Sequence, residues 1–377
     1  MSSAPDFIPQ TNPLASYLAH KDEINEAIDK VLRKGQYILG EEAKQFEDNF
    51  GLYLHGAQVV GTGSGTDAIH LALLVCGIGQ NDVVVTVSHT AVATVAAIHL
   101  AGAKAAFVDI DPVTFTMSPQ SLEELLPVFR RNFGSRLKAI LPVHLYGNPA
   151  DMKRIKRIAD SHELIVIEDC AQSHGAEIDS KKTGTWGIIG AFSFYPTKNL
   201  AAIGDGGAIV TSNAELSEKA KFLREYGWKE RYISSEYGMN TRLDELQAAI
   251  LNVKLKYLDQ EIKRRREIAD LYDSLLTEFP ITIPSKSSVY HQYVICVENR
   301  DSLRQHLQKD FIGTAIHYPL PVHLQPAYLE ESIPYRKNLM ETEKVCRQIL
   351  SLPLYPELEN SKVIRVGEQI RKWFNQH

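Results

Sequence analysis

The sequence predicts an α/β protein whose larger part is a mostly parallel sheet covered by helices on both faces. Short apolar stretches alternate with stretches of helical periodicity between residues 57 and 172. The apolar stretches are nearly continuous, which is typical of strands that are buried on both faces of a sheet. After Pro280 the alternation ends, and the 377 residues leave room for a second, smaller α+β unit.

The expected elements of the larger part follow one another as strand and helix pairs. The expected strands are residues 57–63, 82–88, 104–110, 137–147 and 164–172. The expected helices that alternate with them are residues 66–78, 91–102, 118–129 and 149–162. Ser118 is a suitable N-cap for the third helix, and Pro149 is a suitable first residue for the fourth.

A long helix after the sheet carries the predicted domain boundary. Its apolar face comprises Leu243, Leu246, Ile250, Val253 and Tyr257. The segment KRRRE, residues 263–267, lies on its continuation, and we expect it to be a solvated face. We place a large domain at residues 1–250 and a small C-terminal domain at residues 251–377, with a strand near 288–298.

Composition narrows the class of protein. With 44% hydrophobic residues, 23% charged residues and a net charge of -5, the chain has a globular composition and no basic tail for nucleic acid. No apolar stretch reaches the roughly 18 residues of a membrane helix, and the N-terminal stretch does not resemble a signal peptide. Its cysteines, which have no metal-binding spacing, are Cys76, Cys170, Cys296 and Cys346. We therefore expect a cytoplasmic protein without a metal site.

A glycine-rich turn follows the first expected strand. In VVGTGSGTDA the glycines are spaced G-x-G-x-G, whereas a dinucleotide site requires G-x-G-x-x-G. Asp82, at the distance where that motif has an acid, precedes its strand instead of ending it. The turn is therefore either a cradle for a single phosphate or a plain tight turn.

Two acids and one lysine are the strongest candidates for chemistry. Glu168 and Asp169 end an apolar strand, where an acid needs a cationic partner, so one of them should face the crevice unless both are structural. Lys198 lies in an apolar, glycine-rich stretch, where it either extends its amine to the surface or is reactive. A lysine, an acid and a phosphate cradle together form the set that pyridoxal phosphate requires.

With these residues in place, the chain resembles the DegT/DnrJ/StrS family of pyridoxal-phosphate-dependent nucleotide-sugar aminotransferases. The resemblance covers nearly the whole chain. The stretches that carry it, in chain order, are GQYILGEEAKQFEDNF, GTGSGTDAIHLAL, SHTAVAT, FVDIDPVTF, LPVHLYGNPADM, IEDCAQSHGA, FSFYPTKNLAAIGDGGAIVT, YGMNTRLDELQAAIL and HYPLPVHLQPAY.

The resemblance implies an aspartate-aminotransferase-like fold of type I and pyridoxal 5'-phosphate as the cofactor. Lys198 would bind the cofactor covalently, and Asp169 would pair with its ring nitrogen. Gln172 would lie near the phenolic oxygen of the ring. Because relatives that become dehydratases have histidine in place of the lysine, Lys198 implies transamination.

The resemblance also implies where the phosphate binds. Ser193 and the backbone N–H groups of Gly65 and Thr66 would hold it. Asn240 would reach the same phosphate from the partner subunit, which implies a homodimer with shared active sites. One departure concerns the ring itself, since many members have a stacking aromatic residue where this chain has Ala91.

For the substrate, the resemblance is strongest to enzymes that transfer an amino group from glutamate to carbon 3 of a dTDP-linked 3-keto-6-deoxyhexose. Such enzymes serve the biosynthesis of amino sugars for surface polysaccharides, S-layers or antibiotics. His317 and His323 would contact the sugar, and Arg231 and Tyr232 are candidates for the nucleotide phosphates. The alternatives are an aminotransferase acting on carbon 4 of a dTDP- or UDP-linked 4-keto sugar and, more remotely, a noncatalytic regulator with the same fold.

Overall fold

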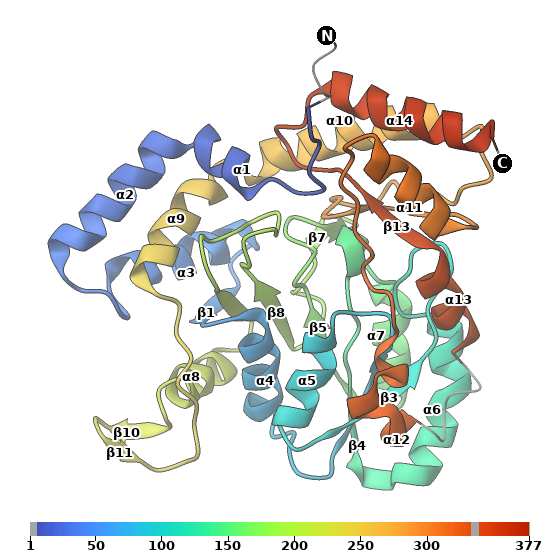
Figure 1. The fold of residues 1–377 in the computed structure, drawn as a ribbon. Helices are drawn as coiled ribbons and strands as arrows, with labels where there is room; N and C mark the ends of the chain where they lie inside the picture. The colour runs from blue at the N-terminus through green and yellow to red at the C-terminus, as the bar shows by residue number, and fades with distance from the viewer. Residues whose placement is uncertain (1–5, 333–338, 377) are drawn as a thin grey trace.

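A seven-stranded sheet with the order β1-β9-β8-β5-β4-β2-β3 forms the centre of the molecule (Figure 1). The computed structural model describes residues 6–332 and 339–376. The strands of this sheet are β1 (Gln58–Thr62), β2 (Val83–Val87), β3 (Lys104–Val108), β4 (Leu137–Ile140), β5 (Ile165–Asp169), β8 (Ile189–Ser193) and β9 (Gly207–Thr211). β9 runs antiparallel to β1 and β8, and the other pairs are parallel, so the prediction of a mostly parallel sheet is confirmed.

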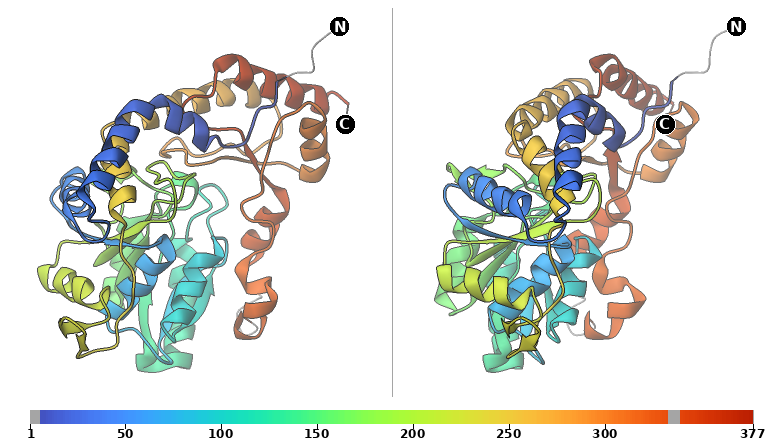
Figure 2. Two further views of the ribbon diagram at one scale, coloured as in Figure 1. Left: turned by 60° about the vertical axis from the view of Figure 1, so that its left-hand side comes forward. Right: turned by 90° about the vertical axis from the view of Figure 1, so that its left-hand side faces the viewer.

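Helices cover both faces of this sheet (Figure 2). They are α3 (Glu41–Tyr53), α4 (Gly65–Val75), α5 (Val92–Leu100), α6 (Pro119–Phe133), α7 (Met152–Ser161) and α8 (Ala214–Leu223). Successive side chains along each strand point to opposite faces of the sheet. Val60 and Ile209 belong to the core that contains α4, whereas Val59 and Val210 pack in the core that contains α3.

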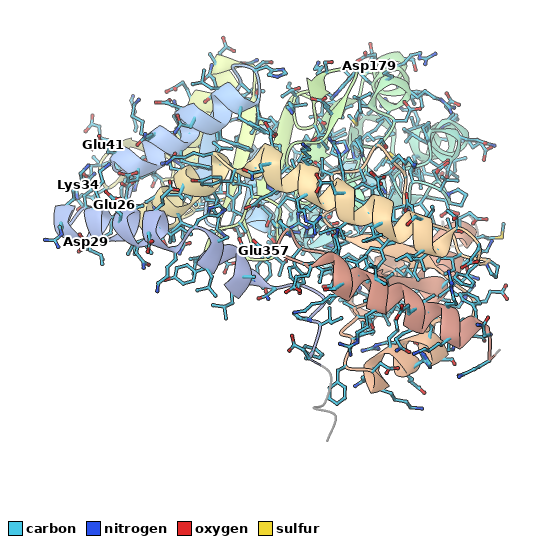
Figure 3. All side chains as sticks on the ribbon, turned by 90° about the horizontal axis from the view of Figure 1, so that it is seen from above. Glu26, Asp29, Lys34, Glu41, Asp179 and Glu357 are labelled. Atoms are coloured by element: carbon cyan, nitrogen blue, oxygen red, sulfur yellow. The ribbon has the colours of Figure 1, made fainter. Side chains whose placement is uncertain are left out.

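A smaller unit lies at one end of the sheet and has its own core of tyrosine, leucine and isoleucine side chains. Its elements are α10 (Leu258–Leu276), β12 (Tyr293–Cys296), α11 (Arg300–Lys309), α13 (Met340–Gln348), β13 (Ile349–Leu352) and α14 (Asn360–Phe374). α14 lies alongside α10, as Figure 3 shows. Ile8 also packs in this core, so the N-terminal segment crosses to the smaller unit. The division at residues 250 and 251 stays a prediction.

The remaining elements are peripheral to the sheet. They are α1 (Pro13–Ala19), α2 (Lys21–Lys34), α9 (Glu245–Leu255), α12 (Leu329–Ser332) and the paired strands β6 (Glu177–Ile178) with β7 (Lys181–Lys182) and β10 (Trp228–Glu230) with β11 (Ile233–Ser234). Lys34 and Glu41 form an ion pair where α2 and α3 meet, a corner that Figure 3 labels. None of the helices in the described ranges has the length and apolar character that crossing a lipid bilayer requires.

The structure corrects two predicted boundaries in the larger part. The strand expected at residues 137–147 is only β4, which ends before Pro142, a residue without the N–H that a ladder needs. The helix expected from Pro149 begins at Met152, because the side chain of Asp151 accepts the N–H of Arg154 at 3.1 Å and caps it.

The predicted long helix is two helices, α9 and α10, separated at residues 256–257. The ring of Tyr257 stacks on His20 at a centroid distance of 4.0 Å and its hydroxyl donates to Glu23 of α2, contacts that hold the break. The expectation of a solvated KRRRE face is wrong for its middle. Arg265 is buried and donates to the carbonyl of Tyr290 at 3.3 Å.

Candidate active site

Asp169 is the acid that ends β5, and it is buried. Its Oδ2 accepts a hydrogen bond from the hydroxyl of Thr94 at 2.8 Å, and its Oδ1 accepts the N–H of Ala171 at 3.0 Å. Burial raises the pKa of Asp169, while these two hydrogen bonds and the charge of Lys198 act in the opposite direction. Asp169 is thus a buried carboxyl group whose orientation is fixed by two hydrogen bonds, and a cation would stabilise its charged form.

Glu168, the neighbour of Asp169, has a structural role. Its carboxylate accepts the N–H groups of Gly184, Trp186 and Gly187 at 2.7–2.8 Å and a bond from His144 at 3.0 Å. With Cys170, the side chains of His144 and Glu168 have the spacing of a possible metal site. However, Nδ1 of His144 accepts the N–H of Ala150, so its Nε2 carries the proton donated to Glu168. Hydrogen bonding inside the protein therefore accounts for this cluster.

Lys198 lies in the loop between β8 and β9, where its own N–H donates to the carbonyl of Tyr195 at 2.9 Å. Burial lowers the pKa of Lys198 to about 8, although the negative charge of Asp169 acts to raise it. The two residues of the predicted catalytic pair thus influence each other in the folded chain. A lowered pKa increases the fraction of Lys198 that carries the neutral amine, the form that nucleophilic and proton-transfer chemistry needs.

The glycine-rich turn forms the N-terminus of α4. Ser64 is the N-cap, and its hydroxyl accepts the N–H of Asp67 at 3.1 Å. The N–H groups of Gly65 and Thr66, in the first turn, have no acceptor within the helix. A Cβ on Gly65 would lie 2.5 Å from Cβ of Ser193, so only glycine lets Ser193 approach. Two N–H groups without an acceptor in their own helix, together with the hydroxyl of Ser193, fit a phosphate group.

Gln172 is buried and held on both sides of its amide group. Its Oε1 accepts the backbone N–H of Tyr146 at 2.7 Å, and its Nε2 donates to the hydroxyl of Tyr318 at 3.2 Å. The second hydrogen of Nε2 stays available for a ligand acceptor. The predicted place of Gln172 beside a phenolic oxygen therefore agrees with its donor chemistry.

Buried histidines surround Lys198, and sequence reasoning missed two of them. Burial lowers the pKa of His174 to about 3 and that of His291 well below its ordinary value, and the charge of Lys198 adds to both shifts. These rings are therefore neutral and add no positive charge beside the amine. The position of His174, two residues after Gln172, was the available signal, because both follow the same strand. Nothing in the pattern pointed to His291, which comes from the smaller unit.

The two histidines predicted to contact the sugar differ in their surroundings. His317 lies near Lys198, and burial lowers its pKa to about 4 with a further effect of that lysine. His323 is fully buried, its Nδ1 bonded to the hydroxyl of Ser88 at 2.7 Å and its Nε2 to Glu343 at 3.3 Å. Because both of its ring nitrogens have partners, we leave His323 out of the proposed sugar site.

Three predicted residues are not brought to Lys198 within this chain. Arg231 and Tyr232 are exposed in the hairpin β10–β11, which projects from the body of the molecule (Figure 1), and the guanidinium of Arg231 lies 5.0 Å from the ring centroid of Tyr232. Asn240 is exposed as well. Its neighbour Thr241 contacts the N–H of Gly63 at 2.8 Å and so lies beside the N-terminus of α4.

The donor set fits pyridoxal phosphate. A lysine of lowered pKa, a buried carboxyl group, an amide donor and free N–H groups at a helix N-terminus match an aldehyde, a ring nitrogen, a phenolic oxygen and a phosphate. Ala91 is the N-cap of α5, at the same edge of the sheet, and it presents only a methyl group where many relatives stack an aromatic ring.

Comparison with curated proteins yields relatives of two kinds. The dTDP-3-amino-3,4,6-trideoxy-alpha-D-glucose transaminase of Streptomyces venezuelae is 41% identical over 371 residues, which cover 97% of this chain and 96% of that protein. The pleiotropic regulatory protein of Geobacillus stearothermophilus is 41% identical over 375 residues, which cover 97% of this chain and 98% of that protein.

Among solved structures, DesV of S. venezuelae in complex with a ketimine intermediate has a TM-score of 0.93 and 40% identity, covering 98% of this chain and 99% of that chain. The structure of NtdA from Bacillus subtilis with bound cofactor PMP has a TM-score of 0.86 and 33% identity, covering 98% of this chain and 86% of that chain. The predicted type I fold and the expected cofactor are confirmed by these comparisons.

The family model also extends over nearly the whole sequence. The model of the DegT/DnrJ/EryC1/StrS aminotransferase family matches residues 19–371. The resemblance that the sequence motifs suggested, and the enzyme class that it implied, are confirmed. The chain belongs to the DegT/DnrJ/EryC1/StrS aminotransferase family and is a pyridoxal-phosphate-dependent enzyme.

Proposed function

We propose that this enzyme transfers the amino group of glutamate to carbon 3 of a dTDP-linked 3-keto-6-deoxyhexose. The observation that carries the proposal is the pair Lys198 and Asp169 beside the free N-terminus of α4. The name of the transaminase from S. venezuelae contains a dTDP-3-amino sugar, which supports carbon 3 as the site of transfer and dTDP as the nucleotide. The amino sugar would serve a surface polysaccharide, an S-layer or an antibiotic.

The residues of the site divide the work of this reaction among them. When bound, pyridoxal phosphate withdraws electrons from the carbon that carries the transferred amino group. Asp169 holds a proton on the ring nitrogen, which strengthens that withdrawal. Lys198 first holds the cofactor and, once released as a neutral amine, takes a proton from one carbon and returns it to another. Ser193, Gly65 and Thr66 anchor the phosphate so that both steps occur in one orientation.

The nucleotide-sugar pocket is proposed to lie between two copies of the chain. His317 would contact the sugar from the same chain as Lys198. Arg231, Tyr232 and Asn240 are exposed, and we propose that they complete the site of a partner subunit. Exposed apolar side chains gather near them, including Ile233, which is 59% exposed, and such a patch is typical of an interface.

Two alternatives are kept. The first is amino transfer to carbon 4 of a dTDP- or UDP-linked 4-keto sugar, which needs the same Lys198 and Asp169. The second is a noncatalytic regulator, which the name of the relative from G. stearothermophilus brings into view. The second alternative gives no reason for a lysine of lowered pKa beside a buried acid, because a regulator has no use for that chemistry. We also propose that the enzyme acts in the cytoplasm, where nucleotide sugars are made.

The test is incubation with glutamate and a panel of 3-keto and 4-keto sugar nucleotides, with the new amine located by NMR. We expect an amine at carbon 3, and Lys198→Ala should lower turnover by more than about a hundredfold and abolish the visible absorption of the lysine-bound cofactor. Lys254→Ala is the matched control, because Lys254 is also buried with a pKa lowered by burial. An amine at carbon 4 would refute the regiochemistry, and no transfer by cofactor-loaded protein would favour the regulator.

A further inference from the structure

Tyr146 connects the cofactor side and the substrate side of the site. It is buried in the short 3-10 helix Leu145–Gly147, with a backbone φ of 60° and ψ of 4°. A bulky residue at positive φ is rare, and it persists only where its surroundings determine it. In this conformation its N–H donates to Oε1 of Gln172 at 2.7 Å, while its hydroxyl donates to the carbonyl of His317.

The direction of every hydrogen bond around this hydroxyl can be deduced. A phenol has one hydrogen, and it goes to the His317 carbonyl, which can only accept. The contact of 2.8 Å between the hydroxyl and Nε2 of His89 must therefore be donated by the histidine. Burial lowers the pKa of His89 to about 3, so the ring is neutral and its Nδ1 is an acceptor. The thiol of Cys346 lies 3.3 Å from that nitrogen, and burial raises its pKa to about 12, so it donates.

The result is a one-way chain of hydrogen bonds from the thiol of Cys346, through His89 and Tyr146, to the carbonyl of His317. Its two ends belong to the smaller unit, and its two middle members belong to the larger part. Aromatic contacts hold the middle, since the Tyr146 ring meets His89 and Phe115 at centroid distances of 5.8 and 6.0 Å. The chain therefore ties the segment before Tyr318 to the sheet.

Tyr318 closes the link back to the cofactor side. Its hydroxyl accepts a hydrogen bond from Nε2 of Gln172 at 3.2 Å. Gln172 is thus held by the backbone of Tyr146 on one side and by Tyr318 on the other, and Tyr146 holds the residue before Tyr318. We propose that Tyr146 is a positioning residue whose hydroxyl fixes the His317–Tyr318 segment against Gln172 and so sets the distance between the keto sugar and the cofactor.

This inference rests on the proposed function in one respect, namely that the His317–Tyr318 segment contacts the sugar. Tyr146→Phe removes the hydroxyl and keeps both the ring and the N–H that holds Gln172. We expect the KM for the keto sugar to rise about tenfold, because a buried carbonyl loses its donor and the segment is released. The rate of the glutamate half-reaction and the absorption of the bound cofactor should stay within about twofold, since the backbone N–H of Tyr146 still donates to Gln172.

Tyr272→Phe is the matched control. Tyr272 is also fully buried, and its hydroxyl also donates to a carbonyl, that of Pro353 at 3.0 Å, but it lies in the core of the smaller unit. The substitution Tyr272→Phe should lower the stability of the protein without changing the KM for the keto sugar. His89→Leu removes the donor to Tyr146 without touching Tyr146 and should raise the KM in the same direction, whereas His89→Gln, which can still donate, should restore most of the affinity.

Hydrogen exchange of the apoprotein provides a readout that does not need activity. Peptides covering residues 315–320 should exchange at least about threefold faster in Tyr146→Phe and at the wild-type rate in Tyr272→Phe. Unchanged exchange in this segment together with an unchanged KM would overturn the inference, as would a loss of the glutamate half-reaction equal to the loss with the sugar. If the wild-type enzyme accepts no keto sugar, the proposed function fails, while the exchange experiment still decides the role of Tyr146.

Discussion

At the scale of single residues, Lys198 makes the sharpest prediction. Burial lowers its pKa from 10.5 to about 8, so its neutral fraction should rise with pH and reach one half near pH 8. In the apoprotein the rate of acylation of Lys198 should follow that curve and level off above pH 8. The acylation rates of exposed lysines should instead keep increasing up to about pH 10.4. Competitive labelling with acetic anhydride, read by mass spectrometry, measures both sets of lysines in one sample.

The variant Asp169→Asn tests the cause of this shift. The charge of Asp169 raises the pKa of Lys198, so removing that charge should move the labelling midpoint below pH 8. Burial is the larger cause and remains in the variant. A midpoint near 10.5 in the wild type, or an upward movement in Asp169→Asn, would contradict the environment described for Lys198.

The sequence predicted the chemistry of this residue set better than its geometry. Lys198, Asp169 and the Gly65–Thr66 turn follow from strand ends and glycine spacing, because the edge of a parallel sheet collects such residues. The residue pattern alone left Glu168 and Asp169 as equivalent candidates, since only the pleat of the strand decides which side each faces, and it was the resemblance to the family that singled out Asp169. His291 could not be found, because its contact with the site depends on how the smaller unit packs.

At the scale of elements, α3 is capped by a residue far away in the sequence. Its N-cap, Gly40, has no side chain, and the carboxylate of Glu245 in α9 accepts the N–H groups of Gly40, Glu42 and Ala43 at 2.8–2.9 Å. Glu245 is almost fully buried. A carboxylate that accepts three N–H groups at a positive helix end stabilises both elements.

We expect Glu245→Gln to lower the free energy of unfolding by about 2 kcal/mol, because an amide hydrogen would then face N–H donors. Urea denaturation at a fixed protein concentration measures the change. Glu41→Gln is the control at the same helix end, since the Glu41 side chain is 69% exposed and pairs with Lys34 (Figure 3). Its effect on the free energy of unfolding should be much smaller than that of Glu245→Gln, because solvent screens the exposed pair of Glu41 and Lys34. Equal effects of the two variants would show that burial of the Glu245 cap adds nothing.

Element types were therefore more predictable than element ends. Each expected strand and helix of the larger part exists, because periodicity and burial are local properties. The break at residues 256–257 was missed because helical periodicity continues across it, while its cause is the contact of Tyr257 with His20. The cap of Glu245 on α3 was also missed because it depends on a distant contact, one that joins segments about 200 residues apart.

At the scale of the whole molecule, contacts between the two units determine the shape of the site. The carboxylate of Asp109, after β3, accepts the N–H groups of Glu341 and Thr342 at 2.9 Å and so caps α13 of the smaller unit. The chain from Cys346 to His317 makes a second connection across the same boundary. Both connections hold the smaller unit at a defined distance from the end of β5, which a rigid substrate pocket requires.

A single copy of the chain leaves part of the predicted site unused. The hairpin β10–β11 projects from the molecule (Figure 1), and its residues Arg231 and Tyr232 are exposed, as is Asn240 after it. If each copy contributes these segments to the active site of its partner, each active site combines Lys198 of one copy with Asn240 of the other. The two functions then reside on different chains, and a mixed dimer can separate them.

Lys198→Ala removes the amine, and Asn240→Asp places a negative charge against the cofactor phosphate, so each variant alone should be inactive at limiting cofactor. In a mixed dimer one site carries both defects and the other carries neither. Random exchange of equal amounts makes about half of the dimers mixed, so about a quarter of the wild-type activity should return. Activity is measured after subunit exchange, with mass spectrometry of differently tagged chains as proof of mixing. If mixed dimers form and activity stays absent, each chain builds its site alone, and Asn240 does not act across the interface.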